Sequence, residues 1–220
     1  MWFLLLLLLA LPLYAQEGPP QGPGHILYVD SEDAPGLLKA WRVITLKKPE
    51  LKGPLALRPP SHGWLALAVQ ALEPQTPEAA SQAARDLSRE LKKSVLHMAV
   101  TKDDRAWYFL FQEGKPTDRY CSNPGLPGEA TQEALRDWAG KPDVLLPLCK
   151  GTPLSKTRTE VSLTDLNGLL YYYYPEMKLK KPAAWRTTGD LMKLLCQVLG
   201  LPQPPAPYQA LAGLPGWKRL

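Results

Sequence analysis

The chain has 220 residues, of which 45% are hydrophobic and 21% are charged, with seven tryptophans and a formal net charge of +5. This length suits one domain of ordinary size, and the aromatic content excludes a chain that stays disordered. The charge excess is mild and no helix-turn-helix, RNA-recognition or zinc signature accompanies it, so we do not expect nucleic acid as a partner.

An uncharged apolar run, WFLLLLLLALPLY, occupies residues 2–14. It is shorter than the roughly 17–25 apolar residues of a membrane-spanning helix, and Pro12 interrupts it. We therefore predict an export signal in residues 1–15, cleaved after Ala15, and a secreted or periplasmic protein. An uncleaved segment that anchors the protein to a membrane is the alternative, because no Lys or Arg precedes the run.

Residues 16–24, QEGPPQGPG, are rich in glycine and proline and predict a linker. A single domain is then expected over residues 25–220. At its start, HILYVD (25–30) and WRVITLK (41–47) carry the β-branched and aromatic residues of short strands. Residues 53–63, GPLALRPPSHG, are predicted to be a proline-rich connection.

The apolar run WLALAVQAL, residues 64–72, has the length of a strand and lacks a helix cap. The pattern then changes to a helix over residues 74–93. Thr76 is the predicted N-cap and Pro77 the first helical residue, and apolar residues recur at spacings of three and four. One face of this helix is therefore expected to be buried.

Three strand-like runs follow, SVLHMAVT (94–101), RAWYFLFQ (105–112) and KPTDRYCS (115–122), joined by short polar turns. This pattern predicts an antiparallel meander with the helix on one face. Alternation gives the central strand two apolar faces, formed by Trp107, Phe109 and Phe111 on one side and Tyr108 and Leu110 on the other. The predicted fold class is α+β, an antiparallel sheet flanked by helices in one domain.

Further helices are expected after the meander, and a proline-rich tail follows them. Cap-like residues open each helix: Thr131 before 131–138, Thr164 and Asp165 before 164–174, and Thr187 with Asp190 before the helix that Gly200 ends. The tail from Pro202 is predicted to be coil that docks through Tyr208 and Trp217. The four tyrosines at 171–174 either line a groove for sugars or peptides or pack as part of a helix or strand.

The densest basic stretch is MKLKKPAAWR, residues 177–186. It predicts either a solvated face or a contact with an anionic cell-envelope surface, with Trp185 as an interfacial anchor.

The stretch DRYCSNPG, residues 118–125, is the most distinctive local motif. Its end, Asn-Pro-Gly, predicts a tight turn, because proline fixes φ and glycine tolerates positive φ. Arg, Tyr and Asn are common at protein interfaces. The residues that we predict to bind a ligand are therefore Asp118, Arg119, Tyr120, Ser122 and Asn123. In the alternative interpretation these residues are structural: Asp118 accepts hydrogen bonds from backbone N–H groups, and the Tyr120 side chain packs within the protein.

Cys121 lies within the same motif and raises the question of thiol catalysis. A thiolate nucleophile needs a base, and the candidate for it is His97 on the first meander strand. Cys121, Cys149 and Cys196 form no C-x-x-C pair, so their disulfide pairing stays open and no metal site is expected. No enzyme signature predicts a cofactor.

The segment VLHMAVTKDDRAWYFLFQEGKPTDRYCSNPG, with LGLP near the C-terminus, resembles a family of uncharacterised bacterial proteins. Members pair a helix ending in LSREL with a hairpin and a D-R-Y-x-S-x-P-G stretch, and the resemblance covers roughly residues 64–126 and 187–202. Members often carry His-Asp where this chain has Thr101 and Lys102. The resemblance implies the fold and the loop but no activity.

Taken together, these features predict a non-catalytic exported protein. It would bind a protein partner or a cell-envelope component through residues 118–126 and nearby aromatic side chains. A thiol-dependent hydrolase that uses Cys121 is the alternative.

Overall fold

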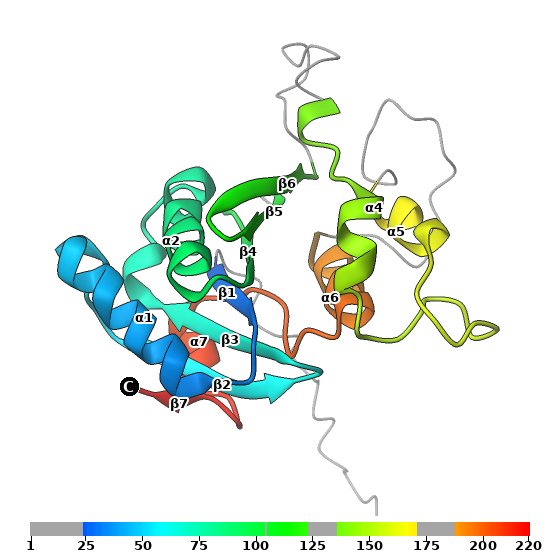
Figure 1. The fold of residues 1–220 in the computed structure, drawn as a ribbon. Coiled ribbons are helices and arrows are strands. Elements are labelled where there is room, and N and C mark those ends of the chain that lie inside the picture. The colour runs from blue at the N-terminus through cyan, green and yellow to red at the C-terminus, as the bar shows by residue number, and fades with distance from the viewer. Residues whose placement is uncertain (1–23, 104, 123–135, 171–187) are drawn as a thin grey trace, which may run out of the picture.

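The computed structural model describes residues 24–103, 105–122, 136–170 and 188–220, and these form one seven-stranded antiparallel sheet with helices on both faces (Figure 1). The predicted α+β class is therefore confirmed. The predicted export signal and all of the predicted linker except Gly24 lie outside the described residues.

The strands lie in the order β6-β5-β4-β1-β3-β2-β7, and each pair is antiparallel. The predicted meander is confirmed as the consecutive neighbours β4, β5 and β6. The strands are β1 Gly24–Asp30, β2 Leu55–Ser61, β3 Trp64–Val69, β4 Ser94–Val100, β5 Ala106–Gln112, β6 Lys115–Cys121 and β7 Lys218–Arg219.

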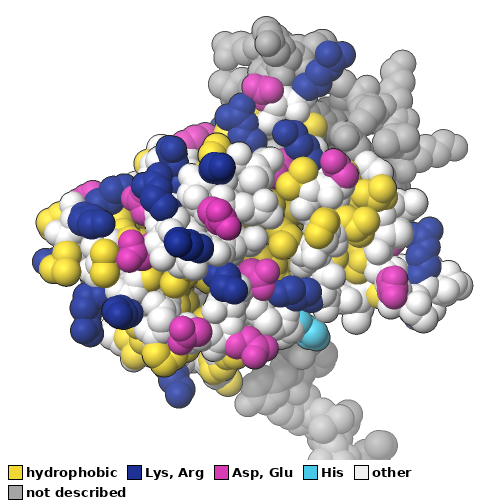
Figure 2. Space-filling view, in the orientation of Figure 1, with side chains coloured by type: hydrophobic (Ala, Val, Ile, Leu, Met, Phe, Trp, Pro, Cys, Tyr) yellow, Lys and Arg dark blue, Asp and Glu magenta, His cyan; other side chains and the backbone are white. Residues whose placement is uncertain are grey.

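Two helices cover one face of the sheet, and the remaining described helices cover the other (Figure 1). Lys and Arg side chains are interspersed with Asp and Glu over the surface seen in Figure 2. The first face is covered by α1 Ala34–Lys47 and α2 Pro77–Leu91; the second is covered by α4 Pro142–Leu145, α5 Leu163–Leu170, α6 Thr188–Leu199 and α7 Tyr208–Ala212. Short 3-10 turns occupy Pro49–Leu51, Gln70–Leu72 and Leu146–Leu148.

Strand β5 contributes to both hydrophobic cores, as its alternation predicts. Trp107 and Phe109 belong to the core beneath α1 and α2, whereas Tyr108 and Leu110 belong to the core beneath α5 and α6. Since β4 and β6 flank it on either side, β5 is covered on both faces and paired on both edges.

The predicted helix over residues 74–93 is confirmed as α2, and its cap explains where it begins. The Thr76 hydroxyl accepts a hydrogen bond from Ala79 N at 3.3 Å, and Pro77 fills the first helical position. At the other end Lys92 adopts φ 52°, the left-handed conformation that terminates many helices.

The prediction of a strand at residues 41–47 is wrong, because these residues form the second half of α1. The Asp33 carboxylate caps the helix by accepting a hydrogen bond from Gly36 N at 2.9 Å. Leu37, Trp41 and Ile44 are buried at helical spacing. Packing of this stripe outweighs the strand preference of the β-branched residues at 43–45.

The prediction of a loop at residues 53–63 is also wrong, because β2 occupies most of that segment. Its two prolines lack the N–H group that a strand donates. Register between β2 and β3 shifts between Arg58 and Ser61, where Pro59 and Pro60 lie. The prolines therefore fall at an irregularity, where they remove no ladder hydrogen bond.

The C-terminal tail docks as predicted, although it is not entirely coil. Tyr208 begins α7 and Trp217 precedes β7, and both side chains are buried. Strand β7 pairs with β2, and Leu220 exchanges two backbone hydrogen bonds with Leu55. The tail therefore adds the last strand to one edge of the sheet.

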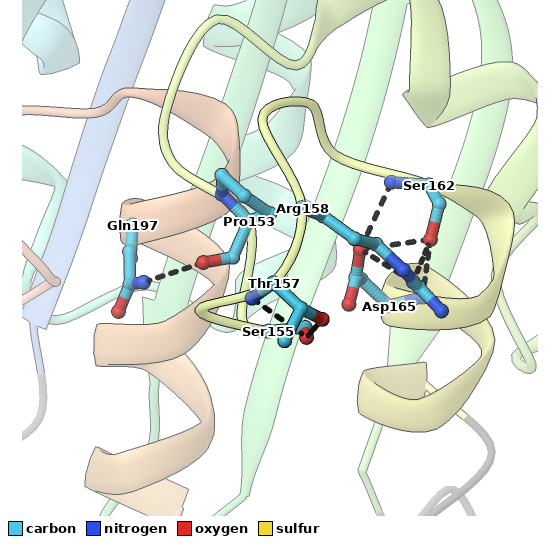
Figure 3. A network of polar contacts seen from close by, with 7 residues as sticks. All are labelled: Pro153, Ser155, Thr157, Arg158, Ser162, Asp165 and Gln197. Carbon is cyan, nitrogen blue, oxygen red and sulfur yellow. Dashed lines mark hydrogen bonds and ion pairs between the residues drawn. The ribbon is translucent and has the colours of Figure 1, made fainter.

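Helix α5 begins at Leu163, and its N-cap is Ser162 rather than the predicted Thr164 (Figure 3). The Asp165 carboxylate accepts hydrogen bonds from Ser162 N at 2.9 Å and Ser162 Oγ at 2.8 Å, while Asp165 N donates to Ser162 Oγ at 3.3 Å. This is a reciprocal capping box, and Arg158 contacts both of its side chains. The chain around it is further held by a hydrogen bond from Gln197 of α6 to Pro153 O.

Gly200 ends α6 as predicted, with φ +72°. The start of the helix expected at Thr131, Thr187, the tyrosines at 171–174 and the basic stretch at 177–186 lie outside the described residues.

Candidate binding groove beside β6

The predicted site residues lie at the end of β6, on an edge of the described sheet. Alternation along a strand predicts that Asp118 and Tyr120 share one face and that Arg119 faces the other, and the structure confirms this. Asp118 and Tyr120 lie on the face of the sheet that packs against α5 and α6, and Arg119 lies on the α2 face. Asn123 lies outside the described residues.

Asp118 is buried and accepts three hydrogen bonds. They come from Tyr108 Oη at 2.7 Å, Arg119 N at 2.8 Å and Lys141 N at 3.0 Å. Burial raises the pKa of the Asp118 carboxyl, and the three donors act in the opposite direction. Asp118 therefore joins β5 and β6 to the segment that begins α4.

Tyr120 and Ser122 also have structural positions. The Tyr120 ring is buried and stacks on Tyr108, with 5.4 Å between the ring centroids. Ser122 exchanges two hydrogen bonds with Ala106, one through its backbone N–H at 2.9 Å and one accepted by its hydroxyl at 3.0 Å. Neither side chain is available to an external ligand.

Arg119 differs because its side chain is 46% exposed while it is held in one position. Its guanidinium carbon lies 4.4 Å from the ring centroid of Trp138. Its Nη2 binds the Asp137 carboxylate at 2.9 Å and its Nε donates to Asp137 O at 3.1 Å. The Trp138 ring in turn packs edge to face against Trp107 and Phe109, with ring centroids 5.1 and 5.7 Å apart. Arg119 is thus an ordered cation at the surface.

A groove of about 500 Å³ opens beside Arg119, between α2 and β6. Phe109, Phe111, Pro116 and Trp138 supply its apolar lining, and its other lining residues are polar or charged. It is lined by Glu78, Ser81, Gln82, Arg85, Phe109, Phe111, Pro116, Thr117, Asp118, Arg119, Arg136, Asp137, Trp138 and Lys141.

The backbone after Trp138 covers the end of β6. Cys121 N donates to Trp138 O at 3.0 Å, and Tyr120 forms an isolated bridge with Ala139. Gly140 turns this segment with φ +74°, and a side chain there would meet Tyr108 Oη at 2.4 Å. This end of β6 is therefore closed to an added strand, so a ligand would contact the groove through side chains.

The structure does not bring Cys121 and His97 together. His97 on β4 pairs with Phe109, whereas Cys121 on β6 pairs with Trp107, so β5 lies between them. Cys121 is fully buried. The described residues thus provide no histidine base beside this thiol.

His97 instead contacts His25 of β1, with 3.0 Å between His97 Nε2 and His25 Nδ1. Burial lowers the pKa of His25 to about 4, although a hydrogen bond to the Gln75 backbone opposes this shift. Burial, and secondarily the neighbouring His25, lowers the pKa of His97 well below its usual value. The pair is therefore neutral at physiological pH.

No disulfide joins the three cysteines, all of which the structure describes. Burial raises the pKa of both Cys149 and Cys196 to about 12, so neither is a thiolate at neutral pH. Within the described ranges there is no cluster of three or more metal-ligating side chains. In the same ranges, no helix is both long and apolar enough to cross a bilayer.

Sequence reasoning did not find the partners of Arg119. Trp138 was predicted only as the end of a helix over residues 131–138, which also contains Asp137. Their contribution depends on tertiary contacts between separate segments, for which the local pattern carries no signal.

Comparisons with protein-family models, with curated proteins and with solved structures returned no match.

Proposed function

We propose that this is a non-catalytic binding protein that captures a protein partner through the groove beside Arg119. The observation that carries the proposal is the geometry of Arg119, which is exposed at the groove yet held by Trp138 and Asp137. Arginine and tryptophan are enriched among the residues that dominate binding energy. An ordered arginine loses little side-chain entropy when a partner binds, which favours affinity.

The buried members of the predicted motif support this proposal indirectly. Asp118 fixes the segment that carries Trp138, and Ser122 fixes the end of β6 against Ala106. They would position the recognition residue without contacting the partner. Recognition would then depend on Arg119 and on the groove walls.

Site-specific photocrosslinking tests the proposal in cells that produce the protein natively. A photoreactive amino acid replaces Gln82, an exposed residue of α2 that lines the groove. The matched control replaces Leu46, which is 69% exposed on α1 and lies outside the groove. We expect a discrete adduct from position 82 alone, and we expect Arg119→Ala to abolish it.

Cys121→Ala separates this proposal from a thiol hydrolase. A binding protein should keep the adduct after Cys121→Ala, whereas an enzyme that uses this thiol should lose its activity. Equal adducts from positions 82 and 46, or an adduct that survives Arg119→Ala, would contradict the proposed site.

The proposal also places the protein outside the cytoplasm, on the strength of the apolar run at residues 2–14. Intact mass spectrometry of native protein tests this. Loss of residues 1–15 is expected, and a mass that retains Met1 would support the membrane-anchored alternative.

A further inference from the structure

A second hollow lies next to the groove, at the turn between β5 and β6. It has a volume of about 360 Å³, and Thr117 lines both it and the groove. Lys92 and Lys93, which follow α2, line it together with Lys115 at the start of β6. The two hollows therefore adjoin at Thr117, and together they make up what we call the track at the edge strand β6.

The track carries an excess of positive charge. Six of its cations have no ion-pair partner among the described residues: Arg85, Lys92, Lys93, Lys115, Arg136 and Lys141. Among the described residues that line the track, only Glu78 and Glu113 oppose them as exposed acids, because Asp137 is paired with Arg119 and Asp118 is buried under three donors.

We infer that the partner contributes an extended acidic peptide segment, which lies along β6 from Arg119 to Lys115. This inference rests on the proposed function and adds the chemistry of the partner. From Arg119 to Lys115 the strand has five residues, which at ~3.3 Å per residue is about 16 Å, so a segment of about five residues would span the track. Carboxylates at its two ends would reach the cations at both hollows.

A peptide fits the track better than a nucleic acid does. Single-stranded nucleic acids stack their bases on open aromatic faces. Here Arg119 lies over the Trp138 ring, and Trp107 and Phe109 pack against it. Glu78 and Glu113 also interrupt the positive charge, which an intermittently acidic peptide tolerates and a continuous phosphate backbone does not.

Fluorescence anisotropy with a labelled peptide of about eight residues, alternating Glu and Ser, tests the inference. The matched probe replaces every Glu with Gln. One variant combines Lys92→Glu, Lys93→Glu and Lys115→Glu, and a second is Arg119→Ala. The control combines Lys39→Glu, Arg42→Glu and Lys47→Glu, which makes the same charge change on exposed positions of α1.

We expect the acidic peptide alone to bind, and we expect both track variants to weaken it about tenfold or more while the control changes it less than about threefold. Binding should also weaken between low salt and roughly 150 mM NaCl, where the screening length is about 8 Å. Equal losses in the control variant would overturn the inference, because they would indicate attraction to net charge alone.

Two further outcomes separate this inference from the proposed function. If the acidic peptide does not bind but the adduct at position 82 still depends on Arg119, the groove binds a partner of other chemistry and only the acidic segment is rejected. Tighter binding of single-stranded oligothymidylate with the same dependence on the track cations would likewise reject the peptide in favour of a nucleic acid.

Discussion

Tyr108 donates its phenolic hydrogen to the Asp118 carboxylate across the β5–β6 ladder, with 2.7 Å between the oxygens. The same carboxylate binds the N–H groups of Arg119 and Lys141. One buried acid thereby ties the sheet to the segment that holds Trp138 beneath Arg119. The geometry of the groove depends on this connection.

Removing the buried acid should therefore cost stability. Asp118→Ala leaves three donors without their acceptor, and we expect the free energy of unfolding to fall by about 2–4 kcal/mol. Tyr108→Phe removes one donor and should cost about 1–2 kcal/mol. Urea unfolding measures both, with Asp143→Ala at an exposed position of α4 as the control. A loss for Asp118→Ala no larger than that for Asp143→Ala would contradict the structural role.

The buried histidine pair should make the protein less stable in acid. The pKa of His25 in the folded protein is lowered to about 4. As the pH falls below about 6.5, His25 therefore binds a proton in the unfolded chain but not in the folded one. The contribution of neutral His25 to the free energy of unfolding is fully present above that pH and is lost toward pH 4. His25 alone should remove roughly 2 kcal/mol between about pH 7.5 and about pH 5, and His97 adds to this loss.

Unfolding at the two pH values checks this prediction in His25→Asn and in the wild-type protein. The variant should show a smaller loss on acidification, even if it is less stable at neutral pH. His62→Asn is the control, since His62 is exposed and asparagine tolerates its positive φ. An undiminished loss in His25→Asn would assign the acid sensitivity to other groups.

All three thiols should react slowly in the folded protein. Cys121 and Cys196 are buried, and the pKa values of Cys149 and Cys196 are raised to about 12. Alkylation at about pH 7 followed by mass spectrometry should leave native protein unmodified under conditions where urea-unfolded protein gains three labels. Partly exposed Cys149 should be the first to react on long incubation. Rapid labelling of Cys121 would instead reopen the thiol hydrolase alternative.

The α5 cap can be tested by comparing two nearby hydroxyl residues. Ser162→Ala should destabilise the protein by about 1 kcal/mol, because Ser162 takes part in the capping box with Asp165. Thr164→Ala should have a much smaller effect, since Thr164 is exposed and lies within the first turn. Thermal unfolding measures both. The reverse order would restore Thr164 as the cap.

Local signals made much of the fold predictable. The start of α2 at Thr76 and Pro77 and the alternation of β5 each depend on a few consecutive residues, and both predictions are confirmed. Helix α1 was missed because its β-branched residues favour a strand, while the burial of Trp41 and its neighbours, which decides the outcome, is a tertiary effect. Strand β2 was missed because its prolines favour a loop. The register shift that accommodates them in the sheet depends on the pairing with β3, which the local sequence does not show.

The candidate site was only partly predictable, for a similar reason. Alternation along β6 correctly separated Arg119 from Asp118 and Tyr120. The contact between Arg119 and Trp138 joins segments that are distant in sequence, and the turn at Gly140 and the hydrogen bond from Lys141 to Asp118 hold it in place. No short motif encodes such a contact.

The pairing of β7 with β2 has a consequence for handling the protein. Removing residues 216–220 would remove the strand that pairs with the outer backbone groups of Leu55 and Leu57. An exposed edge strand is a template on which another copy of the chain can add its own strand. A C-terminal truncation, even one that spares the groove, would thus leave β2 as the edge strand and make the protein prone to self-association.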